Sequence, residues 1–166
     1  MQLYFLRHGV AVDHGAPGYE DNDDARPLTP DGIDLAQRVA KALAAMAPAD
    51  IILTSPLPRA RQTADITAQA LGVDVVETGL LGLSFNRDGL AEALREAEAG
   101  RRKALRKVML VGHEPSMSQT IGALVGPGLR LVLKKNGLAR VDVQGPDLGG
   151  GELRWLLTPG QLKRLG

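Results

Sequence analysis

The sequence contains no cysteine. This absence excludes structural disulfides, thiolate zinc sites and a cysteine nucleophile, and it is compatible with the reducing cytoplasm, where we expect the protein to act. Aromatic residues make up only 3% of the chain, which argues against a stacking surface for single-stranded nucleic acid. The formal net charge is only +1, so the overall charge favours neither nucleic acid nor a membrane surface as a partner.

Long hydrophobic runs and metal-binding motifs are missing as well. No apolar run approaches the ~20 residues that span a membrane, and the amino terminus lacks the basic and apolar regions of a signal peptide. The acidic segment 13–24 does not have the glycine and terminal glutamate of a calcium loop, and His14 within it is expected to be a solvated loop residue. A chain of 166 residues fits one domain, residues 1–166, and can fold without a metal or a disulfide.

Two short apolar runs each lead into a histidine. The first, near the amino terminus, ends in Arg7, His8 and Gly9, and the second, residues 108–111, leads to His113. Such runs are typical of buried strands, whose carboxyl ends form the ligand crevices of open α/β sheets. An arginine can bind phosphate through two parallel hydrogen bonds, an imidazole can be a nucleophile near neutral pH, and a glycine lets the backbone approach a ligand closely.

Another arginine and a serine are candidates at the same edge of the sheet. Arg59 falls in the first turn of a helix predicted after the strand 51–53, where free N–H groups and the helix dipole favour anions. Arg61, two residues further on, is expected to point elsewhere. Ser55 precedes this helix, and it either caps the helix or donates a hydrogen bond to a bound oxyanion.

The order of the expected elements predicts an α/β fold, a three-layer α/β/α sandwich with a mostly parallel central sheet. The expected strands of the parallel part are 3–6, 51–53, 73–76 and 108–111. Closely spaced strands predict an antiparallel edge, and they are 129–133, 138–143 and 152–157. Lys134 and Lys135 follow the strand 129–133, from which they could reach a substrate phosphate. Residues 158–166 are expected to form a terminal turn or helix.

Four motifs together point to a known family. They are Leu6-Arg7-His8-Gly9, Arg26-Pro27-Leu28-Thr29 with Gly32, Thr54-Ser55-Pro56 with Arg59, Arg61, Gln62 and Thr63, and Val111-Gly112-His113-Glu114-Pro115. With these motifs in this order and spacing, the chain resembles the histidine phosphatase (phosphoglycerate-mutase-like) superfamily, and within it the SixA-type phosphohistidine phosphatases. The resemblance implies the phosphoglycerate-mutase-like fold in a single histidine phosphatase domain.

The resemblance also implies roles for the site residues. His8 would attack phosphorus and become phosphohistidine, which water would then hydrolyse. Arg7, Arg59 and His113 would surround the phosphoryl oxygens and stabilise charge in the transition state. The resemblance makes Arg26 a further phosphate ligand. These groups take the place of a metal, so we expect the enzyme to need neither a metal nor another cofactor.

The segment 77–88 is where the chain departs from the larger superfamily. Many members place a carboxylate general acid in this region, within a longer insert, whereas Glu77 and Asp88 are the only acids in the short segment here. An alkoxide leaving group needs proton donation, but the imidazole released from phosphohistidine titrates near pH ~6.5 and needs less help. The short segment therefore favours a P–N bond as the substrate.

Three functions compete at this stage. The first is a phosphatase of histidine-phosphorylated proteins, with a histidine-phosphorelay protein as partner. The second is a phosphatase of small phosphomonoesters that uses the same nucleophile with Glu77 or Asp88 as the acid. The third is a phospholigand-binding module without turnover, against which the paired histidines and the arginines argue. The short chain leaves an open site, which favours the first function. We expect a monomer, and the basic run 101–107 is either a solvated face or a contact surface for an acidic partner.

Overall fold

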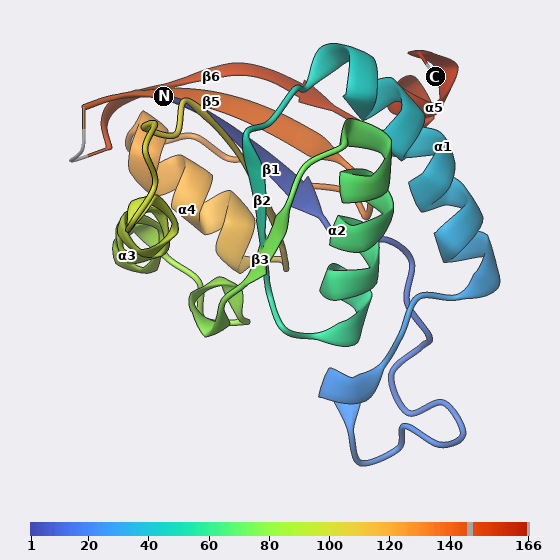
Figure 1. The fold of residues 1–166 in the computed structure, drawn as a ribbon. Coiled ribbons are helices and arrows are strands. Elements are labelled where there is room, and N and C mark those ends of the chain that lie inside the picture. Colours follow the sequence, from blue (N-terminus) through green and yellow to red (C-terminus); the bar gives the residue numbers. More distant parts are fainter. Residues whose placement is uncertain (146–147, 166) are drawn as a thin grey trace.

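The computed structural model describes residues 1–145 and 148–165. Its centre is a six-stranded sheet in the order β3-β2-β4-β1-β5-β6 (Figure 1). The strands are β1 (Gln2–Arg7), β2 (Ile51–Thr54), β3 (Val75–Glu77), β4 (Lys107–Gly112), β5 (Leu138–Gln144) and β6 (Gly149–Leu157). The first four run parallel to one another, while β5 pairs antiparallel with β1 and β6 antiparallel with β5. The structure therefore has the mostly parallel sheet with an antiparallel edge that the sequence predicts.

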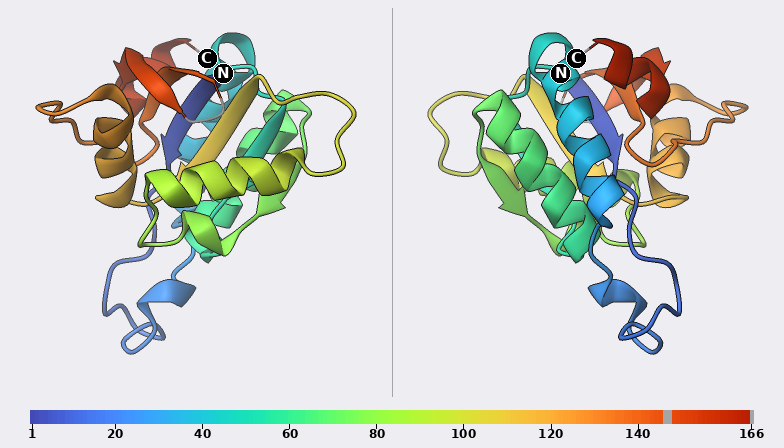
Figure 2. Two further views of the ribbon diagram at one scale, coloured as in Figure 1. Left: turned by 90° about the vertical axis from the view of Figure 1, so that its left-hand side faces the viewer. Right: turned by 90° about the vertical axis from the view of Figure 1, so that its right-hand side faces the viewer.

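Helices cover both faces of this sheet. They are α1 (Pro30–Met46), α2 (Pro58–Leu71), α3 (Arg87–Glu98), α4 (Ser116–Val125) and α5 (Pro159–Leu165), with short 3-10 helices η1 (Asp23–Ala25) and η2 (Gly79–Leu81). Figure 2 shows α1 and α2 on one face, with α5 beside α1, and α3 and α4 on the other. This is the predicted three-layer sandwich. Gly166, the last residue of the expected terminal turn or helix, lies outside the described residues.

The apolar run of β1 supplies both hydrophobic cores. Leu3 and Phe5 pack into the core beneath α3 and α4, whereas Tyr4 and Leu6 pack into the core beneath α1 and α2. Neighbouring side chains of a strand point to opposite faces of the sheet, so four consecutive apolar residues are needed where both faces are covered. All four are essentially inaccessible to solvent. Their packing fixes where the carboxyl end of β1 lies.

Three neighbouring strands end side by side. The register pairs Arg7 of β1 with Gly112 of β4, and β2 lies along the other side of β4. The next residue at each of these ends is His8, His113 and Ser55, respectively. The topology thus brings together three candidate residues that are far apart in the sequence, at the place where open α/β sheets hold their ligands.

The expected strand at 129–133 is wrong, because the structure has an irregular loop between α4 and β5 at these residues. Gly128 has a φ of 96° at the start of the segment, and the backbone groups of Leu133 are occupied by side chains. Its N–H donates to Glu114 Oε1 at 2.8 Å, and its carbonyl accepts a bond from Arg7 Nη1 at 2.9 Å. The segment therefore does not extend the sheet, and its Leu133 positions Arg7 and Glu114 instead.

None of the helices in the described residues is long and apolar enough to cross a lipid bilayer.

Candidate active site

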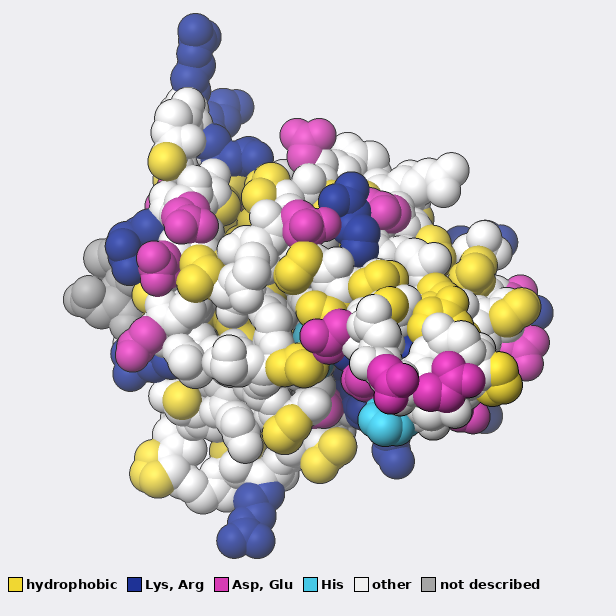
Figure 3. All heavy atoms as spheres, turned by 90° about the horizontal axis from the view of Figure 1, so that it is seen from below, with side chains coloured by type: hydrophobic (Ala, Val, Ile, Leu, Met, Phe, Trp, Pro, Cys, Tyr) yellow, Lys and Arg dark blue, Asp and Glu magenta, His cyan; other side chains and the backbone are white. Residues whose placement is uncertain are grey.

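A pocket of about 380 Å³ opens at the carboxyl ends of β1 and β4. Its lining residues are Arg7, His8, Asp13, His14, Asp23, Arg26, Arg59, Leu83, His113, Glu114 and Lys135. Figure 3 views the molecule from this end and shows acidic side chains gathered on a protruding part of the surface, next to a histidine. The pocket brings together the two histidines, three arginines and one lysine that the sequence predicts for the site.

His8 is held so that one ring nitrogen is left free. Its Nδ1 lies 2.8 Å from the carbonyl oxygen of Gly9. A carbonyl only accepts hydrogen bonds, so Nδ1 carries the proton and the neutral ring has its lone pair on Nε2. Burial lowers the pKa of His8 to about 3, even though the bond to Gly9 opposes the shift. The nearby His113, Arg59 and Arg7 lower the pKa further, so the ring is an uncharged nucleophile at neutral pH.

Gly9 has a packing role at this turn. Its N–H donates to Thr63 Oγ1 at 3.0 Å, which ties the end of β1 to α2. A Cβ at this position would lie 3.1 Å from the Leu28 side chain and 3.2 Å from that of Asn136. A larger residue would therefore require the side chains of Leu28 and Asn136 to move.

The second histidine, His113, lies against the first. The centroids of the two imidazole rings are 5.1 Å apart. His113 Nε2 is 2.8 Å from the hydroxyl oxygen of Ser55. Burial lowers the pKa of His113 to about 4, with smaller contributions from Arg59 and Arg7. Like His8, it is neutral when no anion is bound.

Arg7 and Arg59 place two guanidinium groups at the pocket, that of Arg7 partly buried and that of Arg59 buried. Arg7 donates from Nη1 to the Leu133 carbonyl at 2.9 Å, and its buried Nε has no partner among the described residues. Arg59 stands in the first turn of α2, as predicted, is 3% exposed and donates to the Asp23 carbonyl at 3.0 Å. Burial lowers the pKa of both groups. Cations this poorly solvated attract an anion strongly.

Asp23 contacts both Arg26 and Arg59. It was not among the residues predicted from the sequence. Its carboxylate accepts a bond from Arg26 Nε at 2.7 Å and lies 3.8 Å from Arg59 Nη2. The bond to Arg26 lowers the pKa of this carboxyl. Arg26 also donates to the carbonyl of Val12. The acidic segment was expected to be solvated, and the signal that could have identified Asp23 is its place three residues before a candidate phosphate ligand.

Glu114 was also missed, although it follows His113 directly. Its carboxylate accepts the N–H of Leu133 and the hydroxyl of Ser118. Through Leu133 it fixes the carbonyl that receives Arg7. Its charge also lies close enough to the partly buried Arg7 to act on the pKa of that guanidinium, and the signal that could have identified Glu114 is its place directly after a candidate site histidine.

The structure does not bring the two predicted acids into the pocket. Glu77 lies on an exposed surface and pairs with Arg61 at 3.3 Å, while Asp88 lines a separate small hollow near α3. Arg61 points away from the site, as predicted, and also pairs with Asp65. Ser55 is fully buried and is not among the pocket-lining residues, and the residue that caps α2 is Leu57. Neither sequence-based role for Ser55 describes its position.

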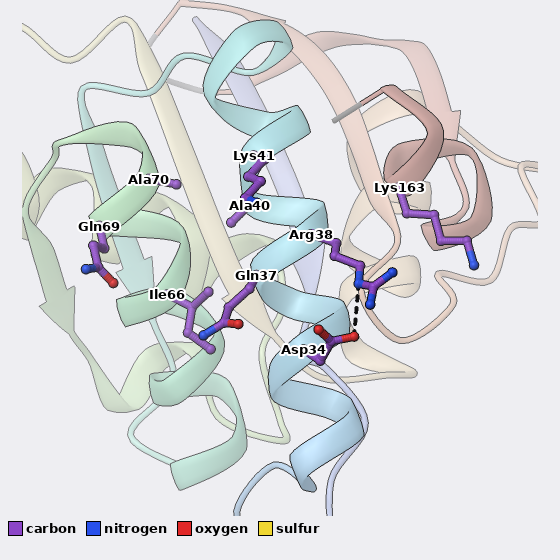
Figure 4. Close-up of a pocket in the computed structure, with 9 residues that line it drawn as sticks. All are labelled: Asp34, Gln37, Arg38, Ala40, Lys41, Ile66, Gln69, Ala70 and Lys163. Carbon is purple, nitrogen blue, oxygen red and sulfur yellow. Dashed lines mark ion pairs between the residues drawn. The ribbon is translucent and has the colours of Figure 1, made fainter.

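A larger hollow lies elsewhere, on the outer surface of α1 and α2. It has a volume of about 780 Å³ and is lined by Asp34, Gln37, Arg38, Ala40, Lys41, Ile66, Gln69, Ala70 and Lys163 (Figure 4). Its side chains are mostly exposed, and Asp34 and Arg38 on its wall are paired at 2.9 Å. None of the predicted site residues lines it. The described residues also contain no group of three or more His, Asp or Glu side chains placed to hold a metal ion.

Comparison with known proteins identifies the family. A family model for the histidine phosphatase superfamily (branch 1) matches residues 3–82. A putative phosphohistidine phosphatase SixA from Agrobacterium tumefaciens is 30% identical, with a TM-score of 0.73 over 95% of this chain and 97% of that one. The chain belongs to the histidine phosphatase superfamily. The predicted resemblance to SixA-type members is confirmed by the same match.

Further matches share the fold or much of the sequence. A protein histidine phosphatase SixA complexed with tungstate has the same fold, with a TM-score of 0.80 at 23% identity over 98% of this chain and 99% of that one. A mycobacterial glucosyl-3-phosphoglycerate phosphatase complexed with VO3 also shares the fold, with a TM-score of 0.69 at 17% identity over 95% and 99%. An uncharacterized protein of Picosynechococcus sp. is 41% identical over 83% of this chain and 82% of its own length. The family membership supports phosphatase activity.

The buried histidines predict that the folded state loses stability on mild acidification. Their ordinary pKa is about 6.5, and the folded protein lowers it to about 3 in His8 and about 4 in His113. Below pH 6.5 the two histidines are protonated in the unfolded chain but stay neutral in the folded protein. Their contribution to the free energy of unfolding is therefore complete above pH 6.5 and falls as the pH is lowered. We expect each histidine to cost up to roughly 2 kcal/mol at about pH 5.

Urea unfolding near pH 7.5 and pH 5 measures this loss of stability. A variant with both His8→Asn and His113→Asn serves as the comparison, because it keeps the shape of both sites without a titrating ring. We expect the free energy of unfolding to fall more between the two pH values in the wild type than in this variant. An equal fall in both proteins would show that the two histidines do not titrate as described.

The contacts of Glu114 predict a positioning role for its carboxylate. Glu114→Ala removes the acceptor of the Leu133 N–H, so the Leu133 carbonyl can no longer hold Arg7 in place. We expect kcat/KM for p-nitrophenyl phosphate to fall roughly 10- to 100-fold, as for the loss of one well-placed oxyanion donor. Glu114→Gln keeps an acceptor oxygen and is the matched control, with an expected loss of less than about threefold. Equal losses in the two variants would contradict the role, because the charge would then matter and the hydrogen bond would not.

Proposed function

We propose that the protein is a phosphohistidine phosphatase that dephosphorylates a histidine-phosphorylated protein, such as a phosphorelay protein, through a phosphohistidine intermediate on His8. The observation that carries the proposal is the bond from His8 Nδ1 to the Gly9 carbonyl at 2.8 Å. It leaves an uncharged Nε2 lone pair in a pocket that also contains Arg7, Arg59 and His113. A neutral nucleophile among cations is suited to attack an anionic phosphoryl group.

The reaction proceeds in two steps. His8 Nε2 attacks phosphorus in line, the Nε2–P bond forms, and the P–N bond of the substrate breaks as its imidazole leaves and takes up a proton from solvent. Water then attacks the phosphorus of phospho-His8, which releases inorganic phosphate and restores the free ring. Arg7 and Arg59 neutralise the equatorial oxygens in both steps, with the unpartnered Nε of Arg7 as an available donor. Arg26 and Lys135 line the same pocket and contribute further positive charge.

The surroundings of the pocket support a P–N substrate. Glu77 and Asp88 lie outside it. Two of the carboxylates that do line it are engaged, because Asp23 pairs with Arg26 and Glu114 accepts the N–H of Leu133. Leu83 contributes an apolar wall that is 53% exposed. An imidazole leaving group can lie against such a wall and needs little protonation by the enzyme.

A phosphatase of small phosphomonoesters is the second candidate, and Asp13 is the observation that favours it. This residue lies on the exposed side of the pocket, where a carboxyl group could protonate an alkoxide leaving group. A mycobacterial glucosyl-3-phosphoglycerate phosphatase has the same fold.

Phosphate release from a phosphohistidine-bearing phosphotransfer protein, measured beside a panel of phosphomonoesters, tests the proposal. We expect kcat/KM to be highest for the phosphohistidine protein and to be unchanged by Asp13→Asn. A preference for one ester that Asp13→Asn abolishes would support the second candidate and contradict the first. Binding of phosphate ligands without turnover of any substrate would contradict both.

A further inference from the structure

We infer that Ser55 is a positioning residue that fixes which ring nitrogen of His113 carries the proton, so that Nδ1–H faces the phosphoryl group as a hydrogen-bond donor. The inference rests on the proposed phosphoryl site, but its first test does not depend on the substrate. It differs from both roles considered for Ser55 from the sequence, since this serine neither caps α2 nor lines the pocket.

Ser55 and His113 meet because their strands are neighbours. Each residue directly follows a strand of the parallel sheet, β2 or β4, and the two strands are paired along their length. The Ser55 hydroxyl oxygen lies 2.8 Å from His113 Nε2. Both side chains are buried, so water does not compete for this bond. The pairing of β2 with β4 therefore determines the contact between Ser55 and His113.

The bonding capacity of the hydroxyl decides the direction of this hydrogen bond. The N–H of Leu57 donates to the Ser55 hydroxyl oxygen at 3.3 Å. The hydroxyl proton then needs an acceptor, and His113 Nε2 is the acceptor within reach among the described residues. When the hydroxyl donates to Nε2, the Leu57 N–H, the Ser55 hydroxyl and His113 Nε2 all have hydrogen-bond partners. If Nε2 carried the proton, the serine hydroxyl would be a buried donor without a partner, which costs free energy.

The consequence for the active site concerns the other ring nitrogen. With Nε2 as the acceptor, the proton of the neutral His113 ring lies on Nδ1. This nitrogen is buried and has no partner among the described residues, while His113 itself lines the pocket beside His8. An N–H at this position can donate to a phosphoryl oxygen, whereas a bare lone pair would repel it. Ser55 therefore turns a neutral histidine into a ligand for an anion without contacting the anion.

The test removes the Ser55 hydroxyl and observes the His113 ring. Ser55→Ala is compared with Thr67→Ala, which removes another buried hydroxyl, on α2, whose hydrogen bond runs to the Thr63 carbonyl. The ring nitrogens are observed by 15N NMR near pH 7, with the His113 signals assigned by their loss in His113→Asn. In the wild type we expect a pyrrole-type Nδ1 and a pyridine-type Nε2. In Ser55→Ala we expect intermediate shifts for both nitrogens, because the two tautomers then mix.

Kinetics with p-nitrophenyl phosphate complete the test. We expect kcat/KM to fall roughly tenfold in Ser55→Ala, which corresponds to the loss of one oriented hydrogen bond, and to change less than about twofold in Thr67→Ala. A protonated Nε2 in the wild type would overturn the inference. Unchanged ring shifts in Ser55→Ala would also overturn it, because a merely structural serine lowers stability without altering the tautomer. Failure of the phosphohistidine assay would leave the ring shifts as predicted, so the two proposals fail separately.

Discussion

His8→Ala is expected to lower kcat by roughly 10⁴-fold or more, on the scale seen when a nucleophile is removed from other enzymes. The reason is that no other buried imidazole among the described residues of the pocket presents a free lone pair. His113 Nε2 is engaged with Ser55, and His14 lies on the exposed acidic segment. Arg7 and Arg59 remain in the variant, so phosphate should still bind. Steady-state kinetics together with isothermal titration of inorganic phosphate measure both properties.

His14→Ala is the matched control for His8→Ala. His14 belongs to the wall of the same pocket, but its side chain is 78% exposed and lies 3.8 Å from Asp23 without a buried contact. Removal of such a surface side chain should change kcat less than about twofold. A strong loss in His14→Ala with activity retained in His8→Ala would show that the nucleophile has been misassigned.

Arg59→Ala is expected to have the second largest effect, a fall in kcat/KM of roughly 10²- to 10³-fold. Arg59 is almost fully buried and stands where free N–H groups of the first turn of α2 already favour an anion. Its guanidinium also donates to the Asp23 carbonyl, so its loss also releases the loop that contains Asp23. Arg59→Lys should recover only part of the rate, because an ammonium cannot contact the loop and two phosphoryl oxygens with the geometry of a guanidinium.

Arg61→Ala separates the local effect of Arg59 from the general effect of positive charge. Arg61 lies on the same helix, carries the same charge and is paired with Asp65 and Glu77 on the exposed surface. It should leave kcat/KM within about twofold of the wild type. If Arg61→Ala were as damaging as Arg59→Ala, long-range charge would explain the result and direct contact with the phosphoryl group would not.

The main lines of the fold could be predicted because each depends on a local pattern. The β1 run at 3–6 is apolar at four consecutive positions, and only a strand covered on both faces requires this. Thr29 and Pro30 mark the start of α1, where the Thr29 hydroxyl accepts the N–H of Gly32 at 3.0 Å. Because the carboxyl ends of parallel strands lie at the same edge of a sheet, the sequence also predicts that His8 and His113 meet there.

The parts that could not be predicted depend on contacts between distant segments. The segment 129–133 is rich in apolar residues like a strand, yet Glu114 and Arg7 bind the backbone N–H and carbonyl of Leu133, which are then not available to pair with a neighbouring strand. The acidic segment appeared solvated, because nothing local shows that Asp23 meets Arg26 and Arg59. Ser55 likewise has a local role available as a helix cap. Its actual partner, His113, is 58 residues away in the sequence.

The covalent step can be followed in time. The protein is mixed with a phosphotransfer protein carrying 32P on histidine, quenched under alkaline conditions at intervals within the first turnover, and analysed for label on each chain. The account predicts that label appears on His8 as acid-labile phosphohistidine before free phosphate accumulates, and that His8→Ala acquires none. Release of phosphate with no label on the wild-type enzyme at any time, or label on a residue other than His8, would contradict it.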